Sequence, residues 1–101
     1  MVIVLFRSKL TDAAGDDYAA MADEMLTRAR TMPGFVDFKS YRADDDERIS
    51  VIHWESQELM RAWSTDVRHI VAQRLGRQKW YDYFHLEVAE VARTYSFERP
   101  A

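Results

Sequence analysis

The stretch FVDFKSYRADDDERISVIHW, from Phe35 to Trp54, decides the fold. Both of its ends are rich in aromatic and β-branched residues, which favour strands. Its centre, residues 43–47, is an alanine followed by four consecutive acidic residues, which stay in water and form a turn. The stretch therefore predicts an antiparallel hairpin with strands at 35–41 and 48–54.

On the N-terminal side of this hairpin, the sequence predicts one strand and one long helix. Residues 2–6 are an unbroken apolar run, VIVLF, which is typical of a strand buried on both faces. The helix has candidate N-caps at Thr11 and Asp12, and it must end at Pro33 and Gly34, which stop a helix. Between them, apolar residues recur at the spacing of one helical stripe: Tyr18, Met21, Met25, Ala29 and Met32.

On the C-terminal side, the sequence predicts a broken helical region and a last strand. Ser56 is a candidate cap for a short helix, and the cluster 64–66 offers a second cap before another helix at 67–75. In residues 83–91, three apolar residues alternate with others, as in a strand with one strongly apolar face: Phe84, Leu86 and Val88. After Arg93 we expect an irregular extension.

The element order is thus β-α-β-β-α-β, the ferredoxin-like arrangement of an α+β fold. It predicts a four-stranded antiparallel sheet with helices on one face, in one domain at 1–94 followed by a tail at 95–101. The strand at 2–6 is apolar on both faces, so the face without helices also needs a cover. A second copy of the chain supplies one, which predicts a homodimer that forms an α/β barrel.

Composition narrows the choice of partners. The 101 residues include 14 basic and 17 acidic ones, a net charge of −3, which gives no general attraction to nucleic acid or to an anionic membrane. No cysteine is present, which excludes disulfides and thiolate metal sites and is compatible with a reducing compartment. The apolar run at 2–6 is too short to span a bilayer. We therefore expect a cytoplasmic protein that binds neither nucleic acid nor membrane.

Several chemically useful side chains can meet between the helices and the sheet. His69 and Gln73 are four positions apart and share a helical face, with Trp63 in the helix before them. Gly76 continues that face and would let another group approach the backbone. Arg7 follows a run of buried residues, so we expect its guanidinium in the same space, where it would hold an anion. Such a pocket suits a flat phenolic or enolic ligand.

Each of these residues also has a purely structural interpretation. Trp63 can be core packing, and His69 can be an ordinary polar residue. Arg7 can instead pair with a carboxylate such as Glu55 or Glu90. Residues 67–81 contain no acidic residue and also allow two interpretations: they either rim a pocket for anions or form a solvated helix face. The basic residues of this stretch are Arg68, Arg74, Arg77 and Lys79.

Metal and cofactor motifs are missing from the sequence. The three histidines, His53, His69 and His85, belong to three different predicted elements, which argues against a metal site. Only three glycines are present, and they form no phosphate-binding loop for a nucleotide or flavin. We therefore expect neither a metal nor a cofactor.

The chain resembles the antibiotic biosynthesis monooxygenase (ABM) domain family over roughly residues 1–94. Five segments carry the resemblance: VLFRSKL at 4–10, MPGF at 32–35, SVIHWE at 50–55, AW at 62–63 and HIVAQRLGR at 69–77. It implies a ferredoxin-like fold and a dimeric α/β barrel. Some members of this family oxidise polycyclic phenols to quinones without metal or flavin, and others degrade haem or act on quinols.

Haem-degrading relatives carry an asparagine at the end of the first strand and an iron-binding histidine ten residues after a tryptophan. Trp63 matches that tryptophan, but Arg7 and Gln73 stand at the two other positions, and a glutamine does not bind haem iron as imidazole does. The resemblance therefore does not favour haem degradation. A haem-binding or haem-degrading relative, with His53 or His85 as the haem ligand, stays open as one alternative.

Together, the residues and the resemblance predict a cofactor-independent monooxygenase that oxidises a small electron-rich aromatic, a phenol or hydroquinone, to a quinone with O2. His69 is the candidate base and Arg7 the candidate partner of the oxyanion. Trp63, Gln73 and Phe35 are the candidate substrate-binding residues. A second possibility stays open: a dimer of the same fold that binds a small ligand without turnover.

Overall fold

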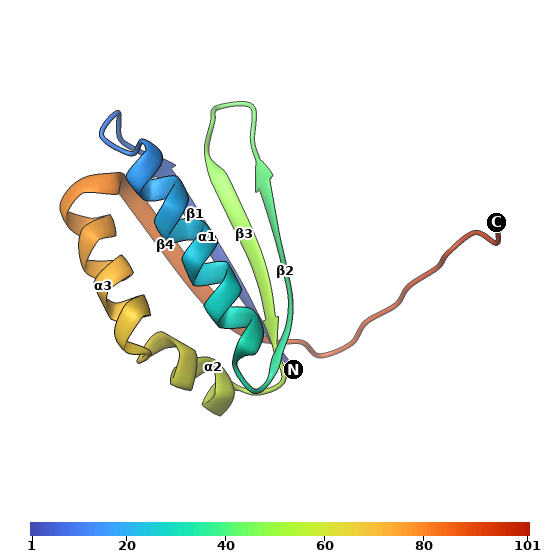
Figure 1. The fold of residues 1–101 in the computed structure, drawn as a ribbon. Helices are drawn as coiled ribbons and strands as arrows, with labels where there is room; N and C mark the ends of the chain where they lie inside the picture. The colour runs from blue at the N-terminus through green and yellow to red at the C-terminus, as the bar shows by residue number, and fades with distance from the viewer.

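The computed structural model covers residues 1–101 and places the helices on one face of a four-stranded antiparallel sheet (Figure 1). The order across the sheet is β2-β3-β1-β4, and the strands are β1 (Val2–Leu10), β2 (Phe35–Arg42), β3 (Arg48–Trp54) and β4 (Tyr81–Glu90). The helical elements are α1 (Asp16–Thr31), α2 (Gln57–Ser64), α3 (Val67–Leu75) and the π-helical turn η1 (Gly76–Trp80). The predicted ferredoxin-like α+β fold is confirmed.

The predicted hairpin is the pair β2 and β3, joined by the acidic turn. The backbone N–H of Ala43 donates to the carbonyl of Glu47 at 2.8 Å, which closes the turn. Asp46 has a φ of 70°, a left-handed conformation that aspartate tolerates better than most residues. Asp44, Asp45 and Asp46 are exposed, as predicted for a solvated turn, whereas the Glu47 side chain is only 16% exposed.

Two predicted boundaries near the N-terminus are wrong, and the last strand begins at Tyr81 rather than at residue 83. β1 runs on to Leu10 rather than ending at Phe6, because its residues keep pairing with both neighbouring strands as far as Ser8. α1 begins at Asp16 with Gly15 at the cap position, and neither Thr11 nor Asp12 caps it. The Thr11 hydroxyl instead donates to the carbonyl of Lys79 at 2.7 Å, which ties the loop before α1 to η1.

The predicted caps of the broken helical region are confirmed. The Ser56 hydroxyl accepts from the backbone N–H of Leu59 at 3.2 Å, at the start of α2. The Asp66 carboxylate accepts from the backbone N–H groups of Arg68 and His69, at the start of α3. α3 passes into η1 without a break, because Gly76 keeps helical dihedral angles, φ −58° and ψ −48°.

The core lies between the sheet and α2. Val2, Val4 and Trp54 are buried there, and Met60 and Trp63 pack against them. Because side chains alternate along a strand, the even-numbered residues of β1 face the helices and the odd-numbered ones face the open side of the sheet. The centre of that open side is apolar and only half-buried in the single chain, and consists of Ile3, Leu5, Ile49 and Val51.

No helix of the chain combines the length and apolar character needed to cross a membrane. Residues 91–101 contain no helix or strand, and they lead away from the body of the domain (Figure 1). Tyr95 and Phe97 in this tail are exposed.

Candidate functional site

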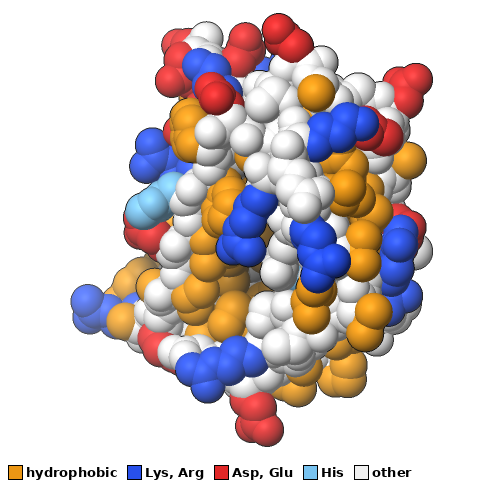
Figure 2. All heavy atoms as spheres, turned by 90° about the vertical axis from the view of Figure 1, so that its left-hand side faces the viewer, with side chains coloured by type: hydrophobic (Ala, Val, Ile, Leu, Met, Phe, Trp, Pro, Cys, Tyr) orange, Lys and Arg blue, Asp and Glu red, His pale blue; other side chains and the backbone are white.

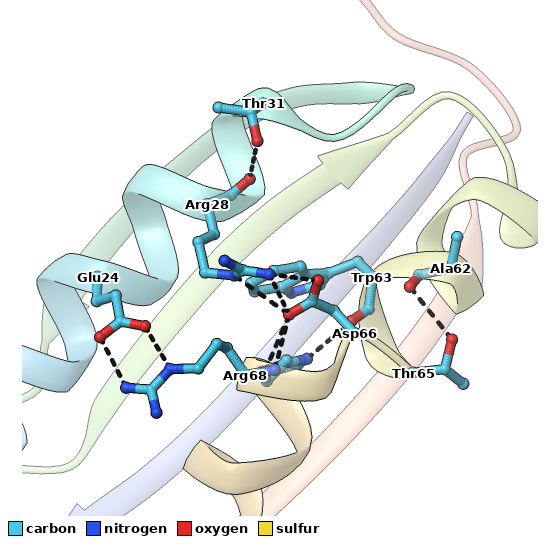
Figure 3. A network of polar contacts seen from close by, with 9 residues as sticks. Glu24, Arg28, Thr31, Ala62, Trp63, Thr65, Asp66 and Arg68 are labelled. Atoms are coloured by element: carbon cyan, nitrogen blue, oxygen red, sulfur yellow. Dashed lines mark hydrogen bonds and ion pairs between the residues drawn. The ribbon is translucent and has the colours of Figure 1, made fainter.

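α3 is anchored to α1 through two ion pairs (Figure 3). Arg28 donates to both oxygens of Asp66, with Nη2 2.9 Å from Oδ2. Arg68 donates to Glu24 from Nε at 2.6 Å and from Nη2 at 2.8 Å. The Arg28 guanidinium lowers the pKa of Asp66, so the carboxylate that caps α3 stays ionised. The first turn of α3 is thus held by its neighbouring helix.

Three apolar residues of β4 are partly exposed, and we call them the β4 row: Phe84, Leu86 and Val88. Its members pair with Ser8, Phe6 and Val4 of β1, so they stand on the helix side of the sheet. They are nevertheless 39%, 51% and 38% exposed, respectively, because α3 makes its main contacts with α1, α2 and η1. Figure 2 shows hydrophobic side chains gathered in a hollow on this side of the molecule, with Lys and Arg side chains beside them.

His69 combines an oriented ring with a free nitrogen. Its imidazole stacks on the Trp63 indole, with centroids 4.3 Å apart and planes inclined by 13°. Its Nδ1 lies 3.2 Å from the Trp63 carbonyl oxygen, which can only accept, so the proton belongs on Nδ1 and Nε2 keeps its lone pair. No residue of the chain hydrogen-bonds to Nε2, and every buried polar side-chain atom has a partner, so Nε2 is accessible to solvent. Burial lowers the pKa of His69, and the ring is neutral at pH 7.

Gln73 connects His69 with a surface hollow. Its amide nitrogen donates to the Ser64 carbonyl at 3.3 Å and lies 3.4 Å from Nδ1 of His69. Gln73 also lines a hollow of about 380 Å³ together with Ile70, Arg74, Arg77 and Gln78. The helix therefore presents His69 and Gln73 side by side, as their spacing predicts.

Trp63 and Phe35 are packing residues in the single chain. Trp63 lies against the core, with its ring centroid 6.5 Å from that of Trp54, and its other neighbour is His69. Phe35 meets Trp54 edge-on at 5.6 Å, and no aromatic contact joins it to His69. The structural interpretation of Trp63 as core packing is confirmed. The substrate contacts of both residues remain predictions.

Arg7 does not lie in the space between helices and sheet, and that expectation is wrong. Phe6 and Ser8 face the helices, so strand alternation turns Arg7 to the open side. There its guanidinium donates to Glu47 at 3.0 and 3.3 Å, rather than to Glu55 or Glu90. The Tyr83 hydroxyl donates to the same carboxylate at 2.6 Å. Arg7 thus joins the acidic turn to the sheet, apart from His69.

Tyr81 completes the walls of the site and could not be found from the sequence. A Cβ on Gly76 would lie 2.7 and 2.8 Å from atoms of the Tyr81 ring, so the group that approaches this glycine is an aromatic ring of the chain itself. Tyr81 meets Phe6 and Phe84 at 5.5 and 6.1 Å. Burial raises its pKa, so its hydroxyl stays protonated.

The histidines do not form a metal site. His53 and His85 stand on the open side of the sheet, where each contacts a carboxylate, Asp37 at 2.6 Å and Glu87 at 2.8 Å, respectively. No group of three or more His, Cys, Asp or Glu side chains is placed to hold a metal ion.

Sequence comparisons match the chain to known proteins along most of its length. The family model "Antibiotic biosynthesis monooxygenase" matches residues 1–75. YqjZ, an uncharacterised protein of Bacillus subtilis (strain 168), is 32% identical over 81 residues, which are 80% of this chain and 71% of YqjZ. The jasmonate monooxygenase ABM of Pyricularia oryzae is 24% identical over 93 residues. That match covers 90% of this chain but only 43% of the enzyme, so the chain spans less than half of it.

Solved structures share the fold. Rv0793 from Mycobacterium tuberculosis superposes with a TM-score of 0.80 at 17% identity, over 94% of this chain and 98% of Rv0793. SnoaB, a cofactor-independent oxygenase from Streptomyces nogalater, superposes with a TM-score of 0.76 at 14% identity, over 92% of this chain and 94% of SnoaB. With the family model matching three quarters of its residues, the chain belongs to the antibiotic biosynthesis monooxygenase family.

Proposed function

We propose that the protein is a cofactor-independent monooxygenase that oxidises a small electron-rich aromatic, a phenol or hydroquinone, to a quinone with O2. The observation that carries the proposal is the free, solvent-accessible Nε2 of a neutral His69 on α3, which continues into η1, the helical turn packed against β4. A general base beside an apolar surface suits a flat substrate with one acidic hydroxyl. Family membership and the fold shared with SnoaB support the same reaction class.

The substrate is the reductant in this proposal. Nε2 of His69 takes the phenolic proton, and the electron-rich phenolate then reduces O2. One oxygen atom bonds to a ring carbon that carries hydrogen: the carbon opposite the hydroxyl in a phenol, or a carbon next to a hydroxyl in a hydroquinone. The other leaves as water with the phenolic hydrogen and the hydrogen of that carbon. A phenol and O2 thus give a quinone and water, and a hydroquinone and O2 give a hydroxyquinone and water, with no external electron donor.

The neighbours of His69 have positioning roles in this scheme. Trp63 sets the plane of the imidazole through the stack at 4.3 Å, and its carbonyl holds the proton on Nδ1. Gln73, beside His69 on the helix, orients the substrate through its amide. The β4 row supplies the apolar surface for the ring, and water excluded from that surface strengthens the charge interactions of the phenolate.

We further propose that a second copy covers the open side of the sheet. Ile3, Leu5, Ile49 and Val51 form its apolar centre, and charged groups such as the Arg7–Glu47 pair lie around them. An apolar centre with a polar rim is typical of an interface between subunits. A twofold dimer buries this surface on both copies at once.

Oxygen uptake tests the proposal. Purified protein is mixed with a panel of hydroquinones and anthrone-like phenols in an oxygen electrode, and we expect uptake above the rate of spontaneous oxidation for at least one compound. The competing function, a carrier that only binds, predicts a ligand-dependent rise in melting temperature with no uptake. That pair of results would reject the enzyme and retain the binding site.

A further inference from the structure

We infer that Arg74 and Arg77 form an anion-binding subsite beside the β4 row, and that the substrate is an aromatic compound that carries a carboxylate. The inference deepens the proposed function, on which it rests for placing the reacting ring near His69.

The stretch from Val67 to Tyr81 has four basic side chains and no acidic residue. Two of the four have carboxylate partners on α1: Arg68 pairs with Glu24, and Lys79 pairs with Asp17, both at 2.6 Å. Arg74 and Arg77 have none, and both are exposed. The two arginines without a partner are therefore the ones with free charge to offer a ligand.

Both arginines line the same hollow. Its volume is about 380 Å³, and its other lining residues are Ile70, Gln73 and Gln78. None of these five is acidic, and the two amides add further hydrogen-bond donors for an anion. A guanidinium binds a carboxylate through two parallel hydrogen bonds, which makes a pair of arginines a selective site for this group.

The hollow adjoins the proposed site for the ring. The guanidinium carbon of Arg77 lies 5.4 Å from the ring centroid of Phe84, the first member of the β4 row. Figure 2 shows Lys and Arg side chains next to hydrophobic side chains on this face of the molecule. A ligand whose ring lies on the β4 row can thus reach Arg77 with a substituent.

Helix geometry sets the length of that ligand. His69, Gln73 and Arg77 are spaced four residues apart along the continuous helix of α3 and η1, so the first and last are about 12 Å apart along its axis. Arginine side chains are long and can shorten this span. A fused bicyclic ring with a hydroxyl at one end and a carboxylate at the other fits the distance.

Two ligands of equal shape test the subsite. We would measure the binding of 6-hydroxy-2-naphthoate and of 6-hydroxy-2-naphthamide by calorimetry without O2, so that no turnover interferes. We expect the wild-type protein to bind the naphthoate about tenfold more tightly, the order of magnitude for two partly exposed charge contacts. The double variant Arg74→Gln/Arg77→Gln should lose this preference and keep its affinity for the amide.

Arg30→Gln is the matched control, because Arg30 is an exposed arginine of α1 without an ion pair. It removes one positive charge elsewhere and should leave the preference unchanged. Equal wild-type affinities, no binding of the naphthoate, or parallel loss of both ligands in the double variant would overturn the subsite. A preference for the naphthoate in a protein that takes up no O2 with any phenol would instead overturn the proposed function and leave the subsite standing.

Discussion

The imidazole of His69 lies almost parallel to the indole of Trp63, with ring centroids 4.3 Å apart. The backbone carbonyl of the same tryptophan holds Nδ1 of His69 at 3.2 Å. One residue thus sets both the plane and the tautomer of the imidazole. Because Trp63 is itself packed on the core formed by Val2, Val4 and Trp54, the position of the proposed base is coupled to the buried core of the domain.

The activity should depend on pH through His69. Burial lowers the pKa of His69 below its usual 6.5, so the neutral ring persists throughout the neutral range and the rate should fall only below about pH 6.5. A His69→Asn variant should lose most of the activity together with this acid limb. His85→Asn is the control, because His85 is on the open side of the sheet beside Glu87. A wild-type rate that is already falling between pH 8 and pH 7 would contradict the assignment.

Asp66 should stabilise the fold in two separable ways, as the cap of α3 and as the partner of Arg28. Asp66→Asn keeps a good cap and removes the ion pair, whereas Asp66→Ala removes both. We expect Asp66→Ala to be the less stable variant by about 1 kcal/mol, measured by urea unfolding. Equal stability of the two variants would show that the cap contributes nothing.

The pKa of Asp66 also predicts an effect of acid. Arg28 lowers this pKa from its usual 3.8, so the carboxylate contributes stability above about pH 4, which is lost as the pH falls through the lowered value. In Asp66→Asn this contribution is missing at every pH. The stability difference between wild type and variant should therefore shrink below pH 4.

Gly76→Ala should destabilise the protein by about 1–3 kcal/mol, because the added Cβ would lie 2.7 Å from the Tyr81 ring. The contact with Tyr81 can be isolated by a double-mutant cycle. In a Tyr81→Leu background the same glycine substitution should cost clearly less, as thermal unfolding can measure. An equal cost in both backgrounds would place the effect elsewhere.

The proposed dimer predicts opposite results for two leucines on the two faces of the sheet. Leu5 belongs to the open side and Leu86 to the β4 row on the helix side. Leu5→Lys should convert a dimer to a monomer in light-scattering chromatography, because it places a charge at the centre of the interface. Leu86→Lys should leave the dimer intact and weaken ligand binding. A wild-type monomer at micromolar concentration would contradict the dimer.

The fold was predictable because its signals are local. The acidic turn at 43–47, the stop at Pro33 and Gly34, and the capping side chains of Ser56 and Asp66 each act within a few residues. The neighbourhood of His69 and Gln73 was predictable for the same reason, since four residues make one helical turn.

The rest of the site depends on contacts between distant residues. The Arg7 side chain points to the open side because side chains alternate along β1, and this direction could have been predicted from its buried neighbours in the sequence. Its partner Glu47 could not, because it lies 40 positions away. The ion pair that holds the start of α3 on α1 joins Arg28 and Asp66, which are 38 positions apart. No periodicity encodes such pairs, because ion pairs across elements are decided by packing in three dimensions.

The central claim, that His69 is the base of a cofactor-independent oxidation, is tested most directly by oxygen uptake at pH 7.5. Wild type and His69→Asn would be compared with the same hydroquinone at saturation. We predict uptake by the wild type and a loss of about 100-fold or more in the variant, the usual contribution of a general base. Equal uptake by the two proteins, or none above the buffer rate by the wild type, would contradict the account.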